Sequence, residues 1–500
     1  MSTEDNRGWS VLRDVGVYGL GNALSSLAGF VCLLILSRAF APTKYGLLAT
    51  LGAVSMLLDV LMVLGADSAL VRHHFETASH AERRTLTTTY IGFIAAWSIV
   101  LCAALVPVAW PASHWLTRSG EAVTPILLVL AMGPIVVTNR LLGQALRNQF
   151  RPVAFVSSDV ASALLDFAFS LIAALALHLG VSGVLLGTLV AEAMVLPVRV
   201  YFVRDLLRWP PSRRLLRPLI AYGAPLVPAS IAYWVFQASD RFILARITSL
   251  AQVGLYGYAI LLMGIGAIIS ASIGMAWIPH AVESATQDRE RAAKQFGRML
   301  TYLLIASGAI AVWITALARP LVLVLGGHAY AGSAIAIGPL ALAFVAMLSS
   351  QVTTIGITIS KRNRYIAQYA AYAAVVNIAL CIALVRLLGM VGAAWATTAA
   401  YLLLTLCSLW RSQRLWPIVY ELRRSATAAV LTVAFVLAAI QTNRSPWHTS
   451  LGAVVIILAL CIGFPALVLV TRTLDGRDVT LLRRYLAGMV AGRRRTGSPD

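Results

Sequence analysis

Charge is scarce in this sequence, and acidic side chains are its scarcest charged groups. Only 12% of the 500 residues are charged, with 20 Asp and Glu against 40 Lys and Arg. In soluble domains about 25% of the residues are charged. Hydrophobic residues make up 59% of the chain. This composition excludes an ordinary soluble protein and indicates one that is embedded in a membrane.

Cysteine is also sparse, and its spacing excludes two common kinds of site. The five cysteines stand singly within apolar segments, without a C-x-x-C pair and without histidines at metal-ligand spacing. We therefore expect no disulfide framework, no metal site and no cofactor. The chain also lacks a phosphate-binding loop of the form G-x-x-x-x-G-K-[ST], so ATP hydrolysis is not expected.

Apolar runs of the length that a spanning helix needs, about 20 residues, recur along the chain. The first run follows Glu4, Asp5 and Arg13 and is long enough to span, so we expect it to be retained rather than cleaved as a signal peptide. Fourteen spans are predicted, at roughly 14–37, 46–71, 89–110, 122–143, 153–178, 181–203, 218–245, 252–279, 297–318, 334–359, 365–387, 390–410, 426–441 and 450–471. The predicted fold is an all-α polytopic membrane protein.

Basic residues fall mostly on one side of these spans. The N-terminal segment, alternate loops and the C-terminal tail hold most of the Lys and Arg, which places both termini in the cytoplasm. The net charge of +20 has the same origin, because basic stretches such as RWPPSRRLLR (208–217) and GRRRTG (492–497) flank spans. We expect contact with anionic lipid head groups and no binding of nucleic acid.

Two segments of the first half recur in the second half at nearly the same offset. RAFAPTKYGLLAT, from Arg38, aligns with RITSLAQVGLYGY, from Arg246, and LGVSGVLLGT (179–188) aligns with LGMVGAAWAT (388–397). Because six is an even number, a six-helix unit used twice enters the membrane from the same side in both copies. The predicted divisions are two parallel six-helix lobes over 1–205 and 206–411, two added spans over 412–475 and a basic cytoplasmic tail over 476–500.

Two parallel lobes are typical of transporters that hold their substrate between the lobes and open alternately to each side. Charges within the spans are costly, and so they indicate functional positions. Asp59, Asp166 and Glu192 fall near the midplane of their predicted spans. With no basic residue recognised at that depth, we expect carboxyl groups that take up a proton or a cation such as sodium. The alternative is that each acid only accepts hydrogen bonds from a neighbouring helix.

A polar stripe accompanies these acids on one face of the fifth span, made of Asp159, Ser162, Asp166 and Ser170. A second stripe of Arg140, Gln144 and Arg147 lies where the fourth span reaches the cytoplasm. A guanidinium group there could bind phosphate with two parallel hydrogen bonds. The alternative is that these arginines only flank the span, as positive-inside topology requires.

The seventh span contains the segment YWVFQASDRFILAR (233–246), which places Asp240 and Arg241 within an otherwise apolar run. These neighbours point about 100° apart on a helix, so we expect each to find another partner. Together with Trp234 and Gln237 they form a polar wedge. Our hypothesis is that Arg241 receives an anionic group of the substrate while Asp240 holds a basic or amide group of another helix and helps to close an external gate. A purely structural charge pair is the alternative.

The residues also resemble a known family. ASDRFILARITSLAQVGLYGYAI (238–260) is similar to the seventh-to-eighth helix signature of bacterial polysaccharide-export flippases, in the multidrug/oligosaccharidyl-lipid/polysaccharide exporter superfamily. RAFAPTKYGLLAT and GQALRNQFRPVAFV resemble its first hairpin and its fourth-to-fifth loop. The resemblance implies alternating-access transfer of an undecaprenyl-pyrophosphate-linked oligosaccharide across the bacterial inner membrane, for exopolysaccharide, capsule or O-antigen synthesis. A polysaccharide polymerase and glycosyltransferases are candidate partners.

Several other functions stay open on the sequence alone. A cation-coupled multidrug exporter of the same superfamily and a flippase for peptidoglycan precursor would share the fold. A polytopic glycosyltransferase would carry its catalytic acids in a sizeable first external loop, whereas that loop here is about AFAPTK (39–44). We therefore expect a transporter and not an enzyme.

Overall fold

The computed structural model describes residues 3–77, 79–117, 120–444, 451–471 and 473–474, with most of the side chains from Val17 onward. The tail predicted over 476–500 lies outside the described residues. The first half of the chain forms α1 (Thr3–Ala39), α2 (Pro42–Val63), α3 (Ala66–Glu76), α4 (His80–Leu105), α5 (Ala109–Thr117), α6 (Val123–Asn148), α7 (Pro152–Leu171), α8 (Gly180–Val203), α9 (Arg213–Gly223) and α10 (Val227–Ile247). The second half forms α11 (Leu250–Gln287), α12 (Arg289–Ala316), α13 (Ala318–Gly326), α14 (Ala334–Thr353), α15 (Ile355–Ile359), α16 (Arg364–Leu388), α17 (Met390–Leu415), α18 (Leu422–Arg444) and α19 (Leu451–Val470).

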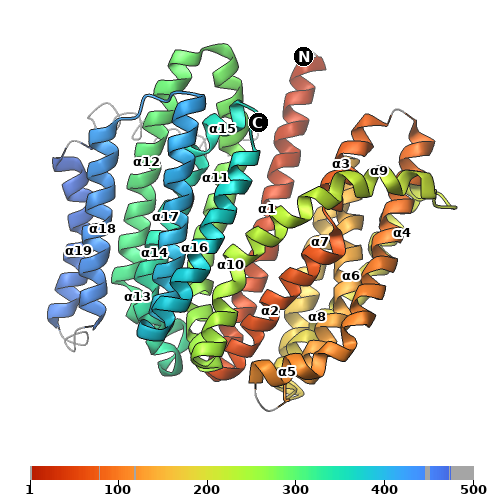
Figure 1. Ribbon diagram of the computed structural model, residues 1–500, viewed down its shortest axis with the longest axis horizontal. Coiled ribbons are helices and arrows are strands. Elements are labelled where there is room, and N and C mark those ends of the chain that lie inside the picture. The colour runs from red at the N-terminus through yellow and green to blue at the C-terminus, as the bar shows by residue number, and fades with distance from the viewer. Residues whose placement is uncertain (1–2, 78, 118–119, 445–450, 472, 475–500) are drawn as a thin grey trace, which may run out of the picture. The chain divides into compact units, whose positions relative to one another are not determined.

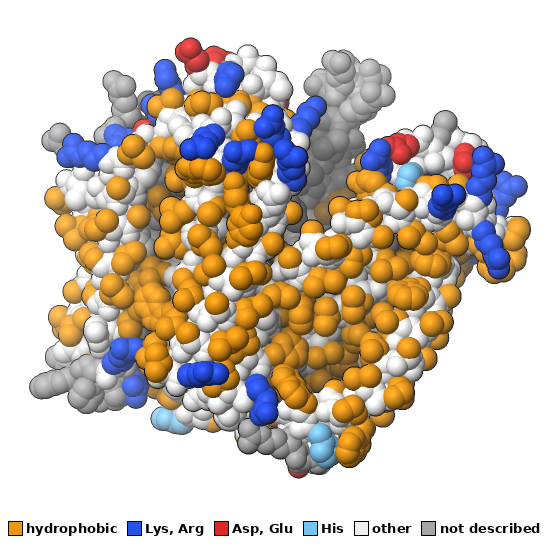
Figure 2. Space-filling model, in the orientation of Figure 1, with side chains coloured by type: hydrophobic (Ala, Val, Ile, Leu, Met, Phe, Trp, Pro, Cys, Tyr) orange, Lys and Arg blue, Asp and Glu red, His pale blue; other side chains and the backbone are white. Residues whose placement is uncertain are grey.

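Nearly all of the predicted spans are present as helices. Among the described residues, 13 helical runs are long and apolar enough to cross a membrane, and the predicted eighth span falls within the 38-residue helix α11. The short run predicted over 426–441 is the middle of α18, which has 23 residues. On the face that Figure 2 shows, Lys and Arg gather toward helix ends while hydrophobic side chains cover the helix flanks. The chain is a multi-pass membrane protein.

The chain divides into two compact units. The first comprises Met1–Leu261, Leu325–Tyr330 and Ala374–Ala393, and the second comprises Leu262–Val324, Ala331–Ala373 and Ala394–Asp500. In the first unit, α8 packs against α6 and α7, and α1 covers the other side of α7 (Figure 1). In the second unit, α12 packs against α14, α18 and α19. These units are defined by contacts between residues and not by the sequence repeat. The division into two lobes at 205/206, which was predicted from the repeat, stays a prediction.

Local signals in the sequence begin several of these helices. Pro42 and Pro152 occupy the first turns of α2 and α7, where the missing backbone N–H would have had no partner in the helix. The side chain of Asp288 caps α12 by accepting a hydrogen bond from the backbone N–H of Arg291 at 3.0 Å. These residues therefore mark where the three helices begin.

The internal repeat is visible in the backbone of matching turns. The turn after α6 has Phe150 at φ 53°, and the turn after α15 has Lys361 at φ 55°. The next residue closes each turn in the same way, because the N–H groups of Arg151 and Arg362 both donate at 3.1 Å to the carbonyl five residues earlier. The aligned glycines Gly180 and Gly389 also match, at φ 59° and 57°. The repeat therefore extends to backbone conformation.

The two aligned glycines of the first repeat signature meet in the first unit. A Cβ atom on Gly46 would lie 1.9 Å from the carbonyl oxygen of Leu250, and one on Gly254 would lie 1.9 Å from that of Pro42. Pro42 and Leu250 are themselves aligned in the repeat. The contact is thus reciprocal, and it brings α2 and α11 so close that only glycine fits at either position.

We predict that Gly46→Ala destabilises the protein by about 1–3 kcal/mol, because backbone atoms must move to admit the methyl group. The matched control is Gly52→Ala on the same helix, where an added Cβ would meet no atom within 4 Å. Thermal unfolding of the detergent-purified variants measures the difference. Equal melting temperatures for the two variants would contradict the close approach.

Candidate functional site

Nearly all of the charged residues predicted within the spans lie in the first unit and have partners there. Arg140 on α6 is placed between two acids. Its Nη1 donates to Oδ2 of Asp59 on α2, and its Nη2 lies 3.7 Å from Oδ2 of Asp67 on α3. Asp67 reaches this position because the chain breaks after α2, with Leu64 and Gly65 at positive φ. The expectation that no basic residue stands at the depth of the acids is wrong for Asp59.

This ion cluster is not sealed inside the protein. The side chain of Arg140 is 40% exposed, and those of Asp59 and Asp67 are 29% and 47% exposed. An arginine in this setting keeps donors that an anion from outside can reach. The cluster can therefore exchange a carboxylate for another anion, which a fully buried pair could not do without leaving charges unpaired.

Gln144 and Arg147 continue from Arg140 along α6, as predicted. Nη2 of Arg147 donates to Oε1 of Gln144, and Nε2 of Gln144 donates to Oδ1 of Asn148 at 2.9 Å. The guanidinium carbon of Arg147 also lies 5.0 Å from the ring centroid of Phe155. Arg147 is exposed and has no carboxylate partner within 4 Å among the described residues. Its role in binding substrate stays a prediction.

Glu192 on α8 accepts three hydrogen bonds within a polar network. Oε1 accepts from Ser162 on α7 at 2.6 Å, and Oε2 accepts from Nδ2 of Asn139 on α6 at 2.6 Å. The same amide group also donates to the backbone carbonyl of Glu192 at 2.8 Å. The predicted stripe on α7 therefore faces α8, and Glu192 ties three helices of the first unit together.

Asp166, by contrast, accepts hydrogen bonds only from hydroxyl groups among the described residues. Its Oδ1 accepts from Ser170 at 2.9 Å and from Thr188 on α8 at 2.7 Å. Hydroxyl groups lower the cost of the carboxylate but bring no positive charge to balance it. Of the three predicted coupling acids, Asp166 is thus the one whose surroundings best suit the exchange of a proton or a cation.

Arg199 on α8 is a buried charge that was not predicted from the sequence, and it is 5% exposed. Its Nη2 lies 3.4 Å from Oδ1 of Asp159, and its Nη1 donates to the backbone carbonyl of Asn139 at 2.9 Å. Ser25 on α1 completes this group by donating to Oδ2 of Asp159 at 3.1 Å. Arg199 therefore balances the charge of Asp159, which was not among the three acids expected to take up a proton or a cation. Arg199 falls inside the predicted span 181–203, so the rule applied to the acids would also have found it.

The segment YWVFQASDRFILAR (233–246) lies on α10, and its Asp240 is buried against α11. Oδ2 of Asp240 accepts from the hydroxyl of Tyr256 on α11 at 2.5 Å, and Asp240 is only 4% exposed. The predicted basic or amide partner of Asp240 is wrong, since the partner is a phenol. Nη1 of Arg241 donates to the carbonyl of Gln237 at 3.1 Å, one turn earlier on the same helix.

The remaining two members of the α10 wedge also have partners. Nε1 of Trp234 donates to the carbonyl of Ala53 on α2 at 2.8 Å, and Nε2 of Gln237 donates to the hydroxyl of Tyr233 at 2.6 Å. Trp234 therefore joins α10 to α2. The roles of Trp234, Gln237, Asp240 and Arg241 in substrate binding stay predictions. No group of three or more His, Cys, Asp or Glu within the described ranges could hold a metal ion.

Long apolar helices, a repeated unit and charged groups partnered inside the membrane define this protein as a multi-spanning transporter-like protein. A model of the polysaccharide biosynthesis protein family matches residues 35–335. The chain belongs to this family. A curated relative is the succinoglycan biosynthesis transport protein ExoT of Rhizobium meliloti (strain 1021), with 26% identity over 348 residues. The match covers 67% of this chain and 65% of the relative, which is less than two thirds of the relative's length.

Solved structures of low sequence identity share the fold. The lipid II flippase MurJ in an inward closed conformation has a TM-score of 0.72 and 11% identity, over 90% of this chain and 98% of that one. An inward-facing multidrug-resistance MATE transporter of the MOP superfamily has a TM-score of 0.62 and 14% identity, over 81% of this chain and 95% of that one. A Vibrio cholerae MATE transporter has a TM-score of 0.59 and 13% identity, over 84% of this chain and 98% of that one. The predicted family and fold are confirmed.

We predict that Asp240→Ala lowers stability by about 1–3 kcal/mol, because it leaves the buried Tyr256 hydroxyl without this acceptor. Tyr256→Phe removes the other partner, so the double variant should lose less than the sum of the single losses. Arg241→Ala, which removes a bond within one helix, should change stability by less than about 0.5 kcal/mol. Denaturant unfolding of the four variants tests this, and additive losses would contradict a direct Asp240–Tyr256 bond.

Proposed function

We propose that this protein is a flippase that moves an undecaprenyl-pyrophosphate-linked oligosaccharide from the inner to the outer leaflet of a bacterial inner membrane. Family membership carries this proposal, since the chain belongs to a polysaccharide biosynthesis family and is built almost wholly of spanning helices. The names of the relatives support it, one being a succinoglycan transport protein and another a lipid II flippase. Both termini lie in the cytoplasm in this proposal, and the chain catalyses no covalent step.

Arg140 is the proposed contact for the pyrophosphate. In the structure its guanidinium group is shared between Asp59 and Asp67, so the cluster has one more acid than base and is net negative when empty. An incoming pyrophosphate would replace one carboxylate and receive two parallel N–H donors from Arg140. Gln144 and Arg147, along the same helix face, would extend the contact. The freed Asp59 would then be the charge that draws the arginine back once the substrate leaves.

Coupling to an ion gradient is proposed for the acids that lack a balancing arginine. Asp166 has two hydroxyl donors, and Glu192 has donors from Ser162 and Asn139. A proton or a sodium ion could therefore neutralise either carboxylate without breaking an ion pair. Asp59 differs, because its charge is already balanced by the ion pair with Arg140. The coupling role proposed for Asp59 would follow from the movement of Arg140.

A cation-coupled multidrug exporter is the second candidate, because MATE transporters share the fold over more than four fifths of this chain. Reconstituted vesicles separate the two candidates when a fluorescent lipid-linked oligosaccharide is compared with a cationic dye. Movement of the lipid without the dye supports the flippase, and movement of the dye alone contradicts it. In the cell, a polysaccharide polymerase and glycosyltransferases are the proposed partners, since they would use and supply the transported lipid.

Arg140→Lys is expected to impair flipping nearly as much as Arg140→Ala, about tenfold or more, because an ammonium group cannot offer the two parallel donors of a guanidinium group. The rate of lipid-linked oligosaccharide flipping in vesicles measures this. Arg208→Lys, at an exposed position in a loop, is the matched control and should flip normally. If Arg140→Lys flips as fast as the control, positive charge suffices and recognition by the fork of donors is wrong.

Asp166→Asn and Glu192→Gln should leave the protein folded. The new amide at position 166 can still accept both hydroxyl hydrogen bonds, and the one at position 192 can accept from Ser162 while Asn139 keeps its hydrogen bond to the backbone carbonyl of that residue. Flipping should then lose its dependence on the proton or sodium gradient. Transport is measured in vesicles with and without each gradient, at matched protein levels. Unchanged gradient dependence in both variants would remove these two residues from the coupling mechanism.

A further inference from the structure

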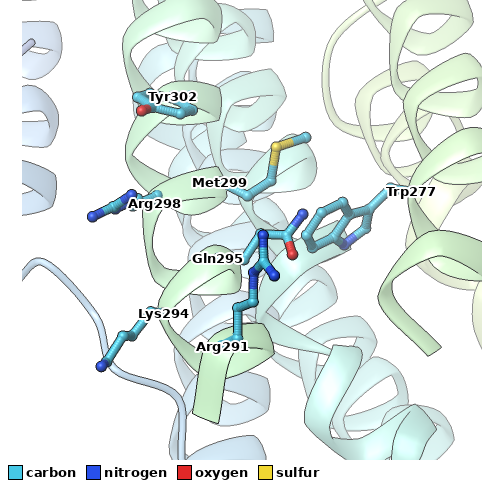
Figure 3. Close-up of a pocket in the computed structure, with 7 residues that line it drawn as sticks. All are labelled: Trp277, Arg291, Lys294, Gln295, Arg298, Met299 and Tyr302. Carbon is cyan, nitrogen blue, oxygen red and sulfur yellow. The ribbon is translucent and has the colours of Figure 1, made fainter. Parts of the chain in front are cut away.

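One hollow of the second unit is lined mainly by hydrogen-bond donors, and its described lining residues include no carboxylate. It has a volume of about 480 Å³ and lies between the late part of α11, which contributes Trp277, and the first turns of α12. Figure 3 shows Arg291, Gln295 and Met299 on the side of α12 that faces Trp277, whereas the side chains of Lys294 and Arg298 extend away from Trp277. We call this hollow the α11–α12 groove. None of its residues belongs to the site proposed above.

The positive charge of the α11–α12 groove is not balanced by the acids nearby. Arg291 and Lys294 are exposed, and within the described part of the chain no carboxylate oxygen lies within 4 Å of either side-chain charge. Asp288 is engaged at the start of α12 by the backbone N–H of Arg291, at 3.0 Å. Glu421 lies 3.5 Å from Arg298, which also borders the groove, and 3.3 Å from Arg424. At least two cations therefore remain for a ligand.

Trp277 adds a donor that has no partner. The residue is 8% exposed, and its Nε1 is buried without a hydrogen-bond partner among the described residues. Its ring is held by an edge contact with Phe296, with the ring centroids 5.3 Å apart. A buried N–H group without an acceptor costs free energy, and such groups are rare in native structures. An acceptor bound in the groove would relieve this cost.

The groove also continues into an apolar hollow. An adjoining space of about 360 Å³ shares Trp277, Gln295 and Met299 with it and adds Ile273 and His280 to the lining. One end therefore offers cations and N–H donors, and the other offers an aromatic ring and aliphatic side chains. A ligand that matches both ends has an anionic head group and an apolar chain.

We propose that the α11–α12 groove binds the phosphate head group of a lipid. The phosphate lies between Arg291 and the Trp277 N–H, Lys294 adds positive charge at the edge of the groove, and the chain lies along Ile273 and Met299. Basic pockets between spanning helices are suited to phosphate head groups of the cytoplasmic leaflet. The turn between α11 and α12 lies on that side if both termini are cytoplasmic, as the proposed orientation has them. The chemistry is shared by anionic phospholipids and by an isoprenoid pyrophosphate.

Native mass spectrometry of the detergent-purified full chain tests the groove, with Arg140→Ala in every variant so that binding of undecaprenyl pyrophosphate at the proposed substrate contact does not mask the groove. Phosphatidylglycerol and undecaprenyl pyrophosphate are the two lipid-phosphate probes, and their relative affinities identify the source of the ligand. We expect the variant Arg291→Gln/Lys294→Gln to bind the preferred lipid about 25-fold more weakly, at about fivefold for each basic residue. Lys361→Gln/Arg362→Gln, an equal loss of charge at an exposed turn of the second unit, should bind normally.

Trp277→Phe separates binding from packing, because it keeps an aromatic ring against Phe296 and removes only the N–H donor. Affinity should fall about fivefold while the melting temperature of the lipid-free protein does not fall. Unchanged affinity in the Arg291/Lys294 variant, equal loss in the Lys361/Arg362 control, or equally tight binding of phosphatidylcholine would overturn the proposal. Inorganic pyrophosphate that binds as tightly as either lipid would also overturn it, since the apolar part would then contribute nothing.

The outcome can be read independently of the flippase proposal. A protein that flips the lipid-linked oligosaccharide normally but binds neither lipid-phosphate probe at the groove overturns this inference alone. A protein that binds a lipid phosphate at the groove but does not flip overturns the proposed function alone.

Discussion

A charge inside a bilayer needs a partner, and this constraint organises the polar interior of the first unit. Arg199 is almost fully buried, and it is stabilised by Asp159 and by a carbonyl of α6. Asn139 supplies that carbonyl and also donates its amide group to Glu192. The partners thus form a chain across α6, α7 and α8. Because breaking one member would leave a buried charge unpaired, the helices that carry them must stay in register.

The same constraint separates the charges that can serve transport from those that hold the fold. A pair that is sealed from solvent, such as Asp240 with Tyr256, can release its partner only at a large cost. Arg140 is 40% exposed and has two carboxylates within reach, so it can change partners without ever being alone. Exposure and redundancy of partners are the physical conditions for an ion pair that moves, and in the first unit the Arg140 cluster meets both.

The spans and their turns could be predicted from the sequence because both depend on neighbouring residues. Helix length follows from the apolar runs, and the repeat signatures led to turns that share positive φ at Gly180 and Gly389. The partners of the charged residues could not be predicted in the same way. Tyr256 is 16 residues from Asp240 and Arg199 is 40 residues from Asp159, and their meeting depends on how two helices are rotated against each other. A helical-face argument places a side chain on a face but does not identify what that face contacts.

The α11–α12 groove shows the opposite situation, because there the described residues include no partner for the charges or for the indole N–H. Paired charges inside the first unit are satisfied by residues brought together in folding, and so they need no ligand to be stable. Arg291 and Lys294 lie at a helix end, where water or a head group can solvate them, and folding alone does not require a carboxylate beside them. Trp277 is different, since its buried N–H group cannot turn to bulk solvent. A buried donor beside solvated cations is therefore the feature that distinguishes a binding groove from an ordinary basic membrane edge.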